Sequence, residues 1–177
     1  MSEEKKTIIR VMPPRIELGK HAQSSIMHAM GRAEDFKNGD EFLINHFNYR
    51  VVMGFFLPKW QRGLVWKESQ EISFLESAWR GLSLGTYTYN TASIGSPYEN
   101  LLIDGQQRMR AFERYFNNEF KVFGYCWDEL GIEEQRGFKT RTVFASFNTE
   151  TENEEFLKEY YNLTNFGGTA HKDNERV

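Results

Sequence analysis

Hydrophobic positions recur at helical spacing in some segments of the chain and alternate with polar positions in others. Ile72, Leu75 and Trp79 lie three or four residues apart and Gly81 follows as a stop signal, so a helix is predicted over 68–80. Because helical and strand-like segments interleave, we expect an α/β (mixed α+β) fold with a small mixed sheet flanked by helices. Further helices are predicted over 19–33, 106–116, 127–138 and 149–161, strands over 48–57, 85–90, 100–104, 119–125 and 140–147, and a turn over 91–99.

The composition is that of one ordinary folded domain. The chain has 177 residues, 40% of them hydrophobic and 15% aromatic, which is enough apolar material for a core and excludes a disordered chain. A net charge of −3 disfavours a nonspecific nucleic-acid coat protein. The single cysteine, Cys126, excludes an internal disulfide and a thiolate metal cage.

No segment of the sequence predicts a membrane partner. The longest apolar stretch, Val51 to Leu57, is far shorter than the roughly 20 residues that span a bilayer. The first ten residues mix acids and bases and lack the apolar region of a signal peptide. We therefore expect a cytoplasmic protein.

Two histidines, His21 and His28, lie seven residues apart in the predicted helix 19–33 and would share one side of it. A metal site needs further ligands, and none lies nearby in the sequence. We therefore interpret both as surface histidines.

The segment around Asp104 carries the strongest chemical signal. A buried strand, Leu101 to Ile103, leads to Asp104, Gly105 permits a sharp turn, and a helix opens at once. The free N–H groups of a helix N-terminus favour anions, and the guanidinium fork of Arg108 fits a phosphate. Asp104 can hold a metal ion or orient an attacking group. The alternative is structural: Asp104 caps the helix and Arg108 is solvated.

A second segment, residues 57–66, places Gln61, Arg62 and Gly63 between Trp60 and Trp66. This pattern indicates a rigid loop that presents the cation of Arg62, although an ion pair with a structural acid is equally compatible. We interpret both tryptophans as core anchors.

A third segment follows the last predicted helix. Two consecutive glycines, Gly167 and Gly168, let backbone amides approach an anion, and Asn165 and Thr169 can donate side-chain hydrogen bonds. The alternative is a helix C-cap. The segment is not a P-loop, because no Lys-Ser/Thr pair follows the glycines.

Taken in chain order, the three segments resemble one known family, the DGQQR-motif domain of the ParB/sulfiredoxin-like fold. The resemblance rests on PKWQRGLVW, on the RGLSLG run that ends helix 68–80, on LLIDGQQRMRAF and on NFGGTAH. It is typified by the N-terminal domain of GmrSD-type modification-dependent restriction enzymes, and it implies a small twisted mixed sheet flanked by helices. We expect one domain over 1–177, in which 1–47 is an N-terminal extension and about 50–171 carries the motifs.

The resemblance implies a nucleotide pocket that binds a nucleoside triphosphate with Mg²⁺ or another divalent cation. By match to the motif, Asp104, Gln107 and Arg108 would be catalytic, and Asp104 would hold the metal. Members of the family often carry Arg two residues before the Asn of the last motif, where this chain has Leu163, so one phosphate contact is missing. The residues implied to bind nucleotide and phosphate are Gln61, Arg62, Gly105, Gln106, Asn165, Gly167, Gly168 and Thr169.

Three functions remain open at this point. The first is an NTP hydrolase or phosphotransferase linked to DNA or to phage–host defence. The second is a DNA-binding or nuclease module with a basic strip, for which the alternative is a solvated helix face, because Glu113 follows Arg110 at ion-pair spacing. The strip would consist of Arg108, Arg110 and Arg114 with Lys59, Arg62 and Lys67.

The third function is a catalytically inactive protein that binds a host or phage protein. The sequence lacks an HNH-like cluster after the motifs, and we expect a stand-alone, phage-encoded version of the domain. Its aromatic residues would supply an exposed patch for the partner, although we favour a place for them in the core. They are Phe36, Phe42, Phe47, Tyr49, Phe55 and Phe56.

Overall fold

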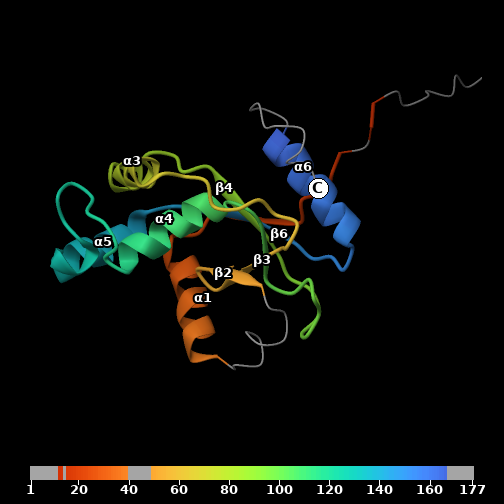
Figure 1. Cartoon of the computed structure of the whole chain (residues 1–177), viewed down its shortest axis with the longest axis horizontal. Coiled ribbons are helices and arrows are strands. Elements are labelled where there is room, and N and C mark those ends of the chain that lie inside the picture. The colour runs from red at the N-terminus through yellow and green to blue at the C-terminus, as the bar shows by residue number, and fades with distance from the viewer. Residues whose placement is uncertain (1–11, 14, 40–48, 167–177) are drawn as a thin grey trace, which may run out of the picture.

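A mixed β-sheet forms the centre of the molecule in a computed structural model, which describes residues 12–13, 15–39 and 49–166 (Figure 1). Within these residues six strands lie in the order β1-β6-β4-β5-β3-β2. Pairs β3/β5 and β4/β6 are parallel and the remaining pairs antiparallel, which confirms the predicted mixed sheet. The strands are β1 Lys20–Ala22, β2 Arg50–Val52, β3 Phe55–Leu57, β4 Thr86–Asn90, β5 Leu101–Asp104 and β6 Ala145–Thr149.

Helices cover both faces of the sheet, and the pleat of the strands decides which residue meets which helix (Figure 1). Phe56 and Ile103 point to one face, where they pack against Tyr161 of α6. Phe55 and Leu102 point to the other face, where α1, α3, α4 and α5 contribute to the larger core. The helices are α1 Met27–Asn38, α3 Glu68–Trp79, α4 Gln106–Phe116, α5 Ile132–Arg141 and α6 Glu154–Phe166, with a short 3₁₀ helix, η1 Trp127–Glu129.

The central elements agree closely with the hydrophobic pattern. The predicted helices 68–80 and 106–116 are α3 and α4, and the predicted strands 85–90 and 100–104 are β4 and β5. Gly81 ends α3 with a φ of +72°, as a C′ glycine should. The turn predicted over 91–99 is also present.

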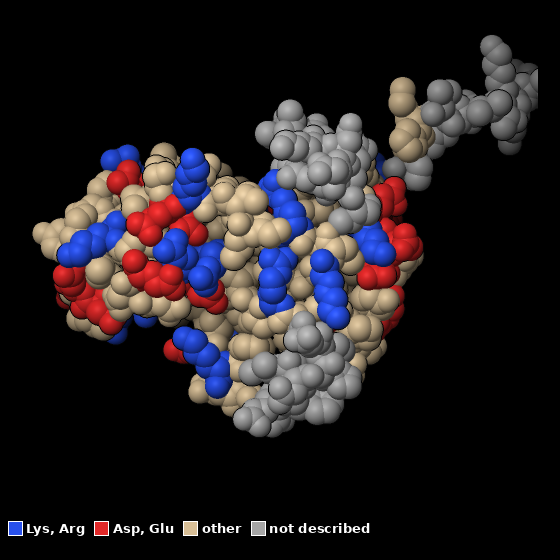
Figure 2. Space-filling view, in the orientation of Figure 1, with Lys and Arg blue, Asp and Glu red and all other residues tan. Residues whose placement is uncertain are grey.

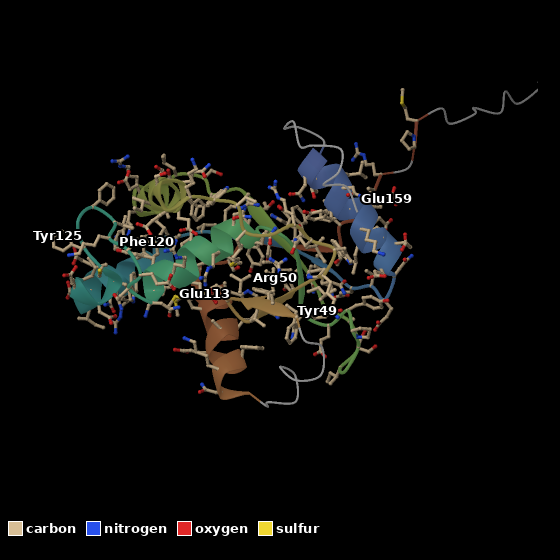
Figure 3. The ribbon with its side chains drawn as sticks, in the orientation of Figure 1. Tyr49, Arg50, Glu113, Phe120, Tyr125 and Glu159 are labelled. Atoms are coloured by element: carbon tan, nitrogen blue, oxygen red, sulfur yellow. The ribbon has the colours of Figure 1, made fainter. Side chains whose placement is uncertain are left out.

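The predicted strand 48–57 is wrong, because this segment is a hairpin. Strands β2 and β3 pair with Val52 opposite Phe55, which leaves Met53 and Gly54 as a two-residue turn. Both have positive φ, 48° and 77°, the signature of a tight type I′ turn. Glu113 of α4 fixes the turn by accepting the Met53 N–H at 2.9 Å (Figure 3). A continuous apolar run concealed this reversal.

The predicted helix 19–33 is also wrong in its first half. His21 belongs to β1 and pairs with Phe147 of β6, and the two rings are in tilted contact with their centroids 4.7 Å apart. Pairing with the sheet edge therefore overrides the local helical preference, and α1 begins only at Met27. His21 and His28 lie in different elements, and both are surface residues, as interpreted.

Four more predictions need correction. Residues 119–125 form a turn closed by a Val122–Tyr125 bridge, with Phe123 and Gly124 at positive φ, instead of a strand. The helix predicted over 127–138 is divided into η1 and α5, and the strand predicted over 140–147 is shifted to β6. Helix α6 begins later than the predicted 149–161, after Asn153, whose side chain accepts the Phe156 N–H at 3.2 Å.

The aromatic residues before the motifs are mainly core residues. Phe55 and Phe56 are fully buried, and Phe36 and Tyr49 pack against the smaller core on the α6 face. Phe42 and Phe47 lie outside the described residues. No helix among the described residues is long and apolar enough to cross a membrane.

Arg114 joins α3 to α4 through a group of carboxylates. It donates to Glu119 at 2.6 Å, to Glu68 at 3.1 Å and to Glu71. The side chain of Glu71 is only 5% exposed, so its charge depends on this partner. The hydrogen bond to Glu119, together with Glu68 and Glu71, raises the pKa of Arg114.

Arg114→Met should lower the free energy of unfolding by about 3 kcal/mol, because it leaves the buried Glu71 carboxylate without its cation. Urea denaturation measures this change. Lys20→Met is the control, since it removes only the exposed Lys20–Glu150 pair and should change little. Equal effects of the two substitutions would show that the Arg114 group contributes no more than a surface pair.

Candidate functional site

A pocket of about 250 Å³ lies where β5 turns into α4. It brings together most of the site residues that were predicted from three segments far apart in the chain. Two residues in its wall were not predicted to be in a site, Trp66 and Tyr161. Gly167, Gly168 and Thr169 lie outside the described residues. The predicted residues that line the pocket are Gln61, Arg62, Asp104, Gly105, Gln106, Gln107, Arg108 and Asn165.

Gly105 creates the turn that opens the pocket. Its φ is +97°, and a Cβ at this position would lie 2.7 Å from the Cβ of Tyr87. Only glycine therefore permits both the left-handed backbone and the close approach to β4. The chain reverses here, so the N-terminus of α4 and its free N–H groups lie beside Asp104.

Asp104 and Arg108 form an ion pair across the first turn of α4. Arg108 Nη2 lies 2.9 Å from Asp104 Oδ2, and the two side chains are 22% and 26% exposed. Arg108 Nη1 also donates to the Leu84 carbonyl at 3.3 Å. The N-cap of α4 is Gly105, without a side-chain cap bond, so the interpretation of Asp104 as a cap is wrong.

The two glutamines of the motif hold the facing loop. Gln107 Oε1 accepts the N–H groups of Val65 and Trp66 at 3.1 and 3.2 Å, and its Nε2 donates to the Gly63 carbonyl at 3.2 Å. Gln106 Nε2 donates to the Arg62 carbonyl at 3.1 Å. The amide of Gln107 is therefore occupied by backbone. Its predicted catalytic role stays a prediction, and the geometry favours a positioning role.

Further contacts fix the same loop from the other side. Gln61 is 4% exposed and donates through Nε2 to the Ile103 carbonyl at 2.8 Å. Arg50 on β2 donates to the carbonyls of Gln61 and Arg62 at 3.0 and 3.3 Å (Figure 3). The Arg62 N–H donates to the Tyr161 hydroxyl at 3.4 Å. The hairpin, β5 and α6 thus converge on one short loop.

Two buried acceptors beside the pocket lack partners. Gln61 Oε1 and Gln106 Oε1 accept no hydrogen bond from any described residue, although each amide is oriented by its own Nε2. An unsatisfied buried carbonyl is costly, on the order of 1–3 kcal/mol. Both belong to residues that line the pocket.

Tyr160 and Thr88 support the carboxylate end of the site. Their hydroxyls lie 2.8 Å apart, and Thr88 is the register partner of Asp104 on the neighbouring strand. Burial raises the pKa of the Tyr160 hydroxyl, and the charge of Asp104 adds to the effect. Tyr160 thus remains protonated and can donate at neutral pH. Apart from the consecutive tyrosines in the last helix, no sequence signal pointed to this residue.

Ion pairs neutralise the helical part of the predicted basic strip. Arg108 pairs with Asp104, Arg110 with Glu113 at 2.6 Å, and Arg114 with its three glutamates. Figure 2 shows positive and negative side chains intermixed over this part of the surface. The predicted basic strip is therefore wrong along α4, because each of its arginines pairs with an acid on β5, α3, α4 or the loop after α4.

The end of α6 brings Asn165 to the pocket. Asn165 Nδ2 donates to the Tyr161 carbonyl at 3.0 Å, which keeps the side chain along the helix. Leu163 is 54% exposed and does not line the pocket. The arginine expected near Asn165 by resemblance thus has no counterpart at this position.

A divalent cation fits this site only together with a phosphate ligand. The described residues contain no group of three or more His, Cys, Asp or Glu side chains that could hold a metal. Asp104 is the one carboxylate among the described residues that line the pocket. Mg²⁺ is commonly held by one or two carboxylates plus substrate phosphate oxygens, which is the arrangement that Asp104 permits.

The sequence of the chain matches a known protein family. Residues 41–176 match the family model of the GmrSD restriction endonuclease N-terminal domain, and the chain belongs to this family. The resemblance stated from the motifs is thereby confirmed. Membership links the chain to restriction, a DNA-directed defence function. No curated protein and no solved structure shows significant similarity to the chain.

Gln107→Met should loosen the loop over residues 63–66, because two backbone N–H groups lose their acceptor and Gly63 loses its donor. Hydrogen–deuterium exchange should show the amides of Val65 and Trp66 exchanging several-fold faster. Gln135→Met is the matched control: Gln135 Nε2 also donates to a backbone carbonyl, that of Trp127 at 3.0 Å, but on α5. Unchanged exchange at Val65 and Trp66 would contradict the clamp.

Proposed function

We propose that the chain binds a nucleoside triphosphate in the β5–α4 pocket and acts as a Mg²⁺-dependent NTP hydrolase or phosphotransferase. The observation that carries the proposal is the placement of Arg108 beside Asp104 at the N-terminus of α4, facing Arg62 across one small pocket. Cations, helix N–H groups and one carboxylate are the parts that phosphoryl transfer requires.

The phosphates would lie at the start of α4. Here Arg108 and Arg62 face the ligand from two elements, and the free N–H groups of the helix add a positive dipole end. The described hydrogen bonds of Arg108 use two of its five N–H donors, so the fork retains donors for a phosphate oxygen. A pocket of about 250 Å³ suits phosphates and part of a sugar, so the base would extend beyond it.

Asp104 would orient the attacking group. Its Oδ2 accepts from Arg108, which leaves Oδ1 to accept from water or from the hydroxyl of an acceptor molecule. When bound with the nucleotide, Mg²⁺ would neutralise charge on the phosphates and would be held by Asp104. Gln106 and Gln107 act through the loop that they hold, as positioning residues.

The nucleotide activity would serve a DNA-directed process, as family membership suggests. We do not assign DNA to the face of α4, since Arg110 and Arg114 are paired with carboxylates and Arg108 is assigned to the nucleotide. Whether the phosphoryl group passes to water or to another acceptor depends on what reaches Oδ1 of Asp104. Both reactions use the same residues.

The proposal predicts a thermal shift with at least one of ATP, GTP, CTP and UTP in the presence of Mg²⁺. Arg108→Lys should weaken nucleotide binding at least about tenfold, because an ammonium cannot replace the two-pronged guanidinium. Asp104→Asn should retain binding and lose phosphate release. Calorimetry and a phosphate-release assay measure the two effects.

Arg110→Lys is the matched control on the same helix, since Arg110 pairs with Glu113 and does not line the pocket. It should leave both binding and turnover unchanged. Absence of a shift with all four nucleotides would contradict the proposal. Equal loss of binding in the Arg108 and Arg110 variants would contradict the placement of the nucleotide phosphates in this pocket.

A further inference from the structure

A second pocket, of about 570 Å³, lies between α1 and the β2–β3 turn. It shares no residue with the β5–α4 pocket, and neither the motifs nor the family match assigns anything to it. Its volume falls within the range of pockets that bind small organic molecules. It is lined by Met27, His28, Gly31, Arg32, Asp35, Phe36, Gly54 and Asn100.

Arg32 is the only guanidinium among the described residues of this wall, and aromatic rings hold it in place. Its Cζ lies 5.0 Å from the centroid of the Phe55 ring and 4.8 Å from that of Tyr89, and both rings are buried. Nη1 donates to Asn100 Oδ1 at 2.5 Å. A guanidinium fixed in this way loses little further conformational freedom when it binds a ligand.

Most donors of Arg32 remain open. A guanidinium has five N–H groups, and the described residues give Arg32 one hydrogen-bond partner and no carboxylate at ion-pair distance. The side chain is partly exposed, so these donors can reach a ligand. A fork of this kind recognises an oxyanion.

The neighbouring charges restrict the kind of anion. Burial, with the charge of Arg32 next, lowers the pKa of His28, so the imidazole is neutral at pH 7 and adds no second cation. Asp35 places a carboxylate in the same wall without pairing with Arg32. Asp35 would repel a highly charged polyphosphate several times more strongly than a singly charged group, because the repulsion grows with the charge of the ligand.

Gly31 places no side chain in the pocket. It lies inside α1, where glycine costs roughly 0.5–1 kcal/mol relative to alanine. A Cβ added at Gly31 would meet no atom within 4 Å, so the glycine does not serve close packing. Met27 and Phe36 beside it offer an apolar surface for the body of a ligand.

We propose that this pocket binds a small molecule that carries one oxyanion on an apolar, planar body, with the oxyanion on Arg32 and the body over Gly31. A carboxylate and a phosphate monoester share this chemistry. The single negative charge of a carboxylate suits the presence of Asp35, so we expect it to bind more tightly.

The test follows the Arg32 Nε–H resonance of the ¹⁵N-labelled full chain during titration with benzoate, phenyl phosphate and neutral benzyl alcohol. Arg32→Lys assigns the signal. We expect saturable shifts with benzoate, weaker ones with phenyl phosphate and none with benzyl alcohol. Tighter binding of phenyl phosphate than of benzoate would overturn the preference for a carboxylate and identify a phosphate monoester as the group that Arg32 binds. No shift with either anion would overturn the proposal.

Gly31→Leu fills the pocket, and Gly31→Ala is its matched control. Benzoate affinity should fall at least about tenfold in the leucine variant and persist in the alanine variant. Equal benzoate affinity in the two Gly31 variants would overturn the proposal. If the leucine variant does not fold, Arg32→Lys provides the test, and unchanged benzoate binding to that variant would overturn the proposal as well. Shifts confined to residues 105–108 would show that the anion binds in the β5–α4 pocket and not beside Arg32. Failure of this proposal can therefore be distinguished from failure of the proposed nucleotide site.

Discussion

The side-chain amide of Gln107 is the contact on which the candidate site depends. It joins the first turn of α4 to the backbone of the loop after β3, through three hydrogen bonds to Gly63, Val65 and Trp66. Without it, Arg62 and Arg108 would lie on elements that need not face one another. The neighbouring Gln106 repeats the contact one residue earlier along the loop. The two consecutive glutamines after the tight turn at Gly105 therefore have a structural role, which is to hold the facing loop, whether or not they take part in catalysis.

The sheet supplies the frame for this contact. The parallel pairing of β3 with β5 places the chain that follows Leu57 beside the chain that follows Asp104, since parallel strands end at the same edge. Helix α6 then covers one face and brings Tyr161 and Asn165 to that edge. The carboxylates around Arg114 join α3 to α4 on the opposite face. The site is thus assembled from three segments by the topology of one sheet.

The hydrophobic pattern predicted the central elements α3, α4, β4 and β5 well, and it predicted the elements around them poorly. The β5–α4 turn was predictable because a buried strand, a glycine and a helix follow one another without ambiguity. Local patterns missed β1, since the pairing of His21 with Phe147 spans the whole domain. They also missed the turn at Met53, where the apolar run continues through the reversal. Tyr161 and the stacked Arg32 are defined by partners distant in sequence, so no spacing signals them.

The central claim is that the loop over Arg62–Trp66 and the turn over Asp104–Arg108 form one phosphate-binding wall. Titration of the ¹⁵N-labelled protein with inorganic tripolyphosphate and Mg²⁺ tests it without assuming a base. The amide shifts of Gly105–Arg108 and of Arg62–Trp66 should saturate together with one dissociation constant. Shifts elsewhere, or in one of the two segments alone, would contradict it.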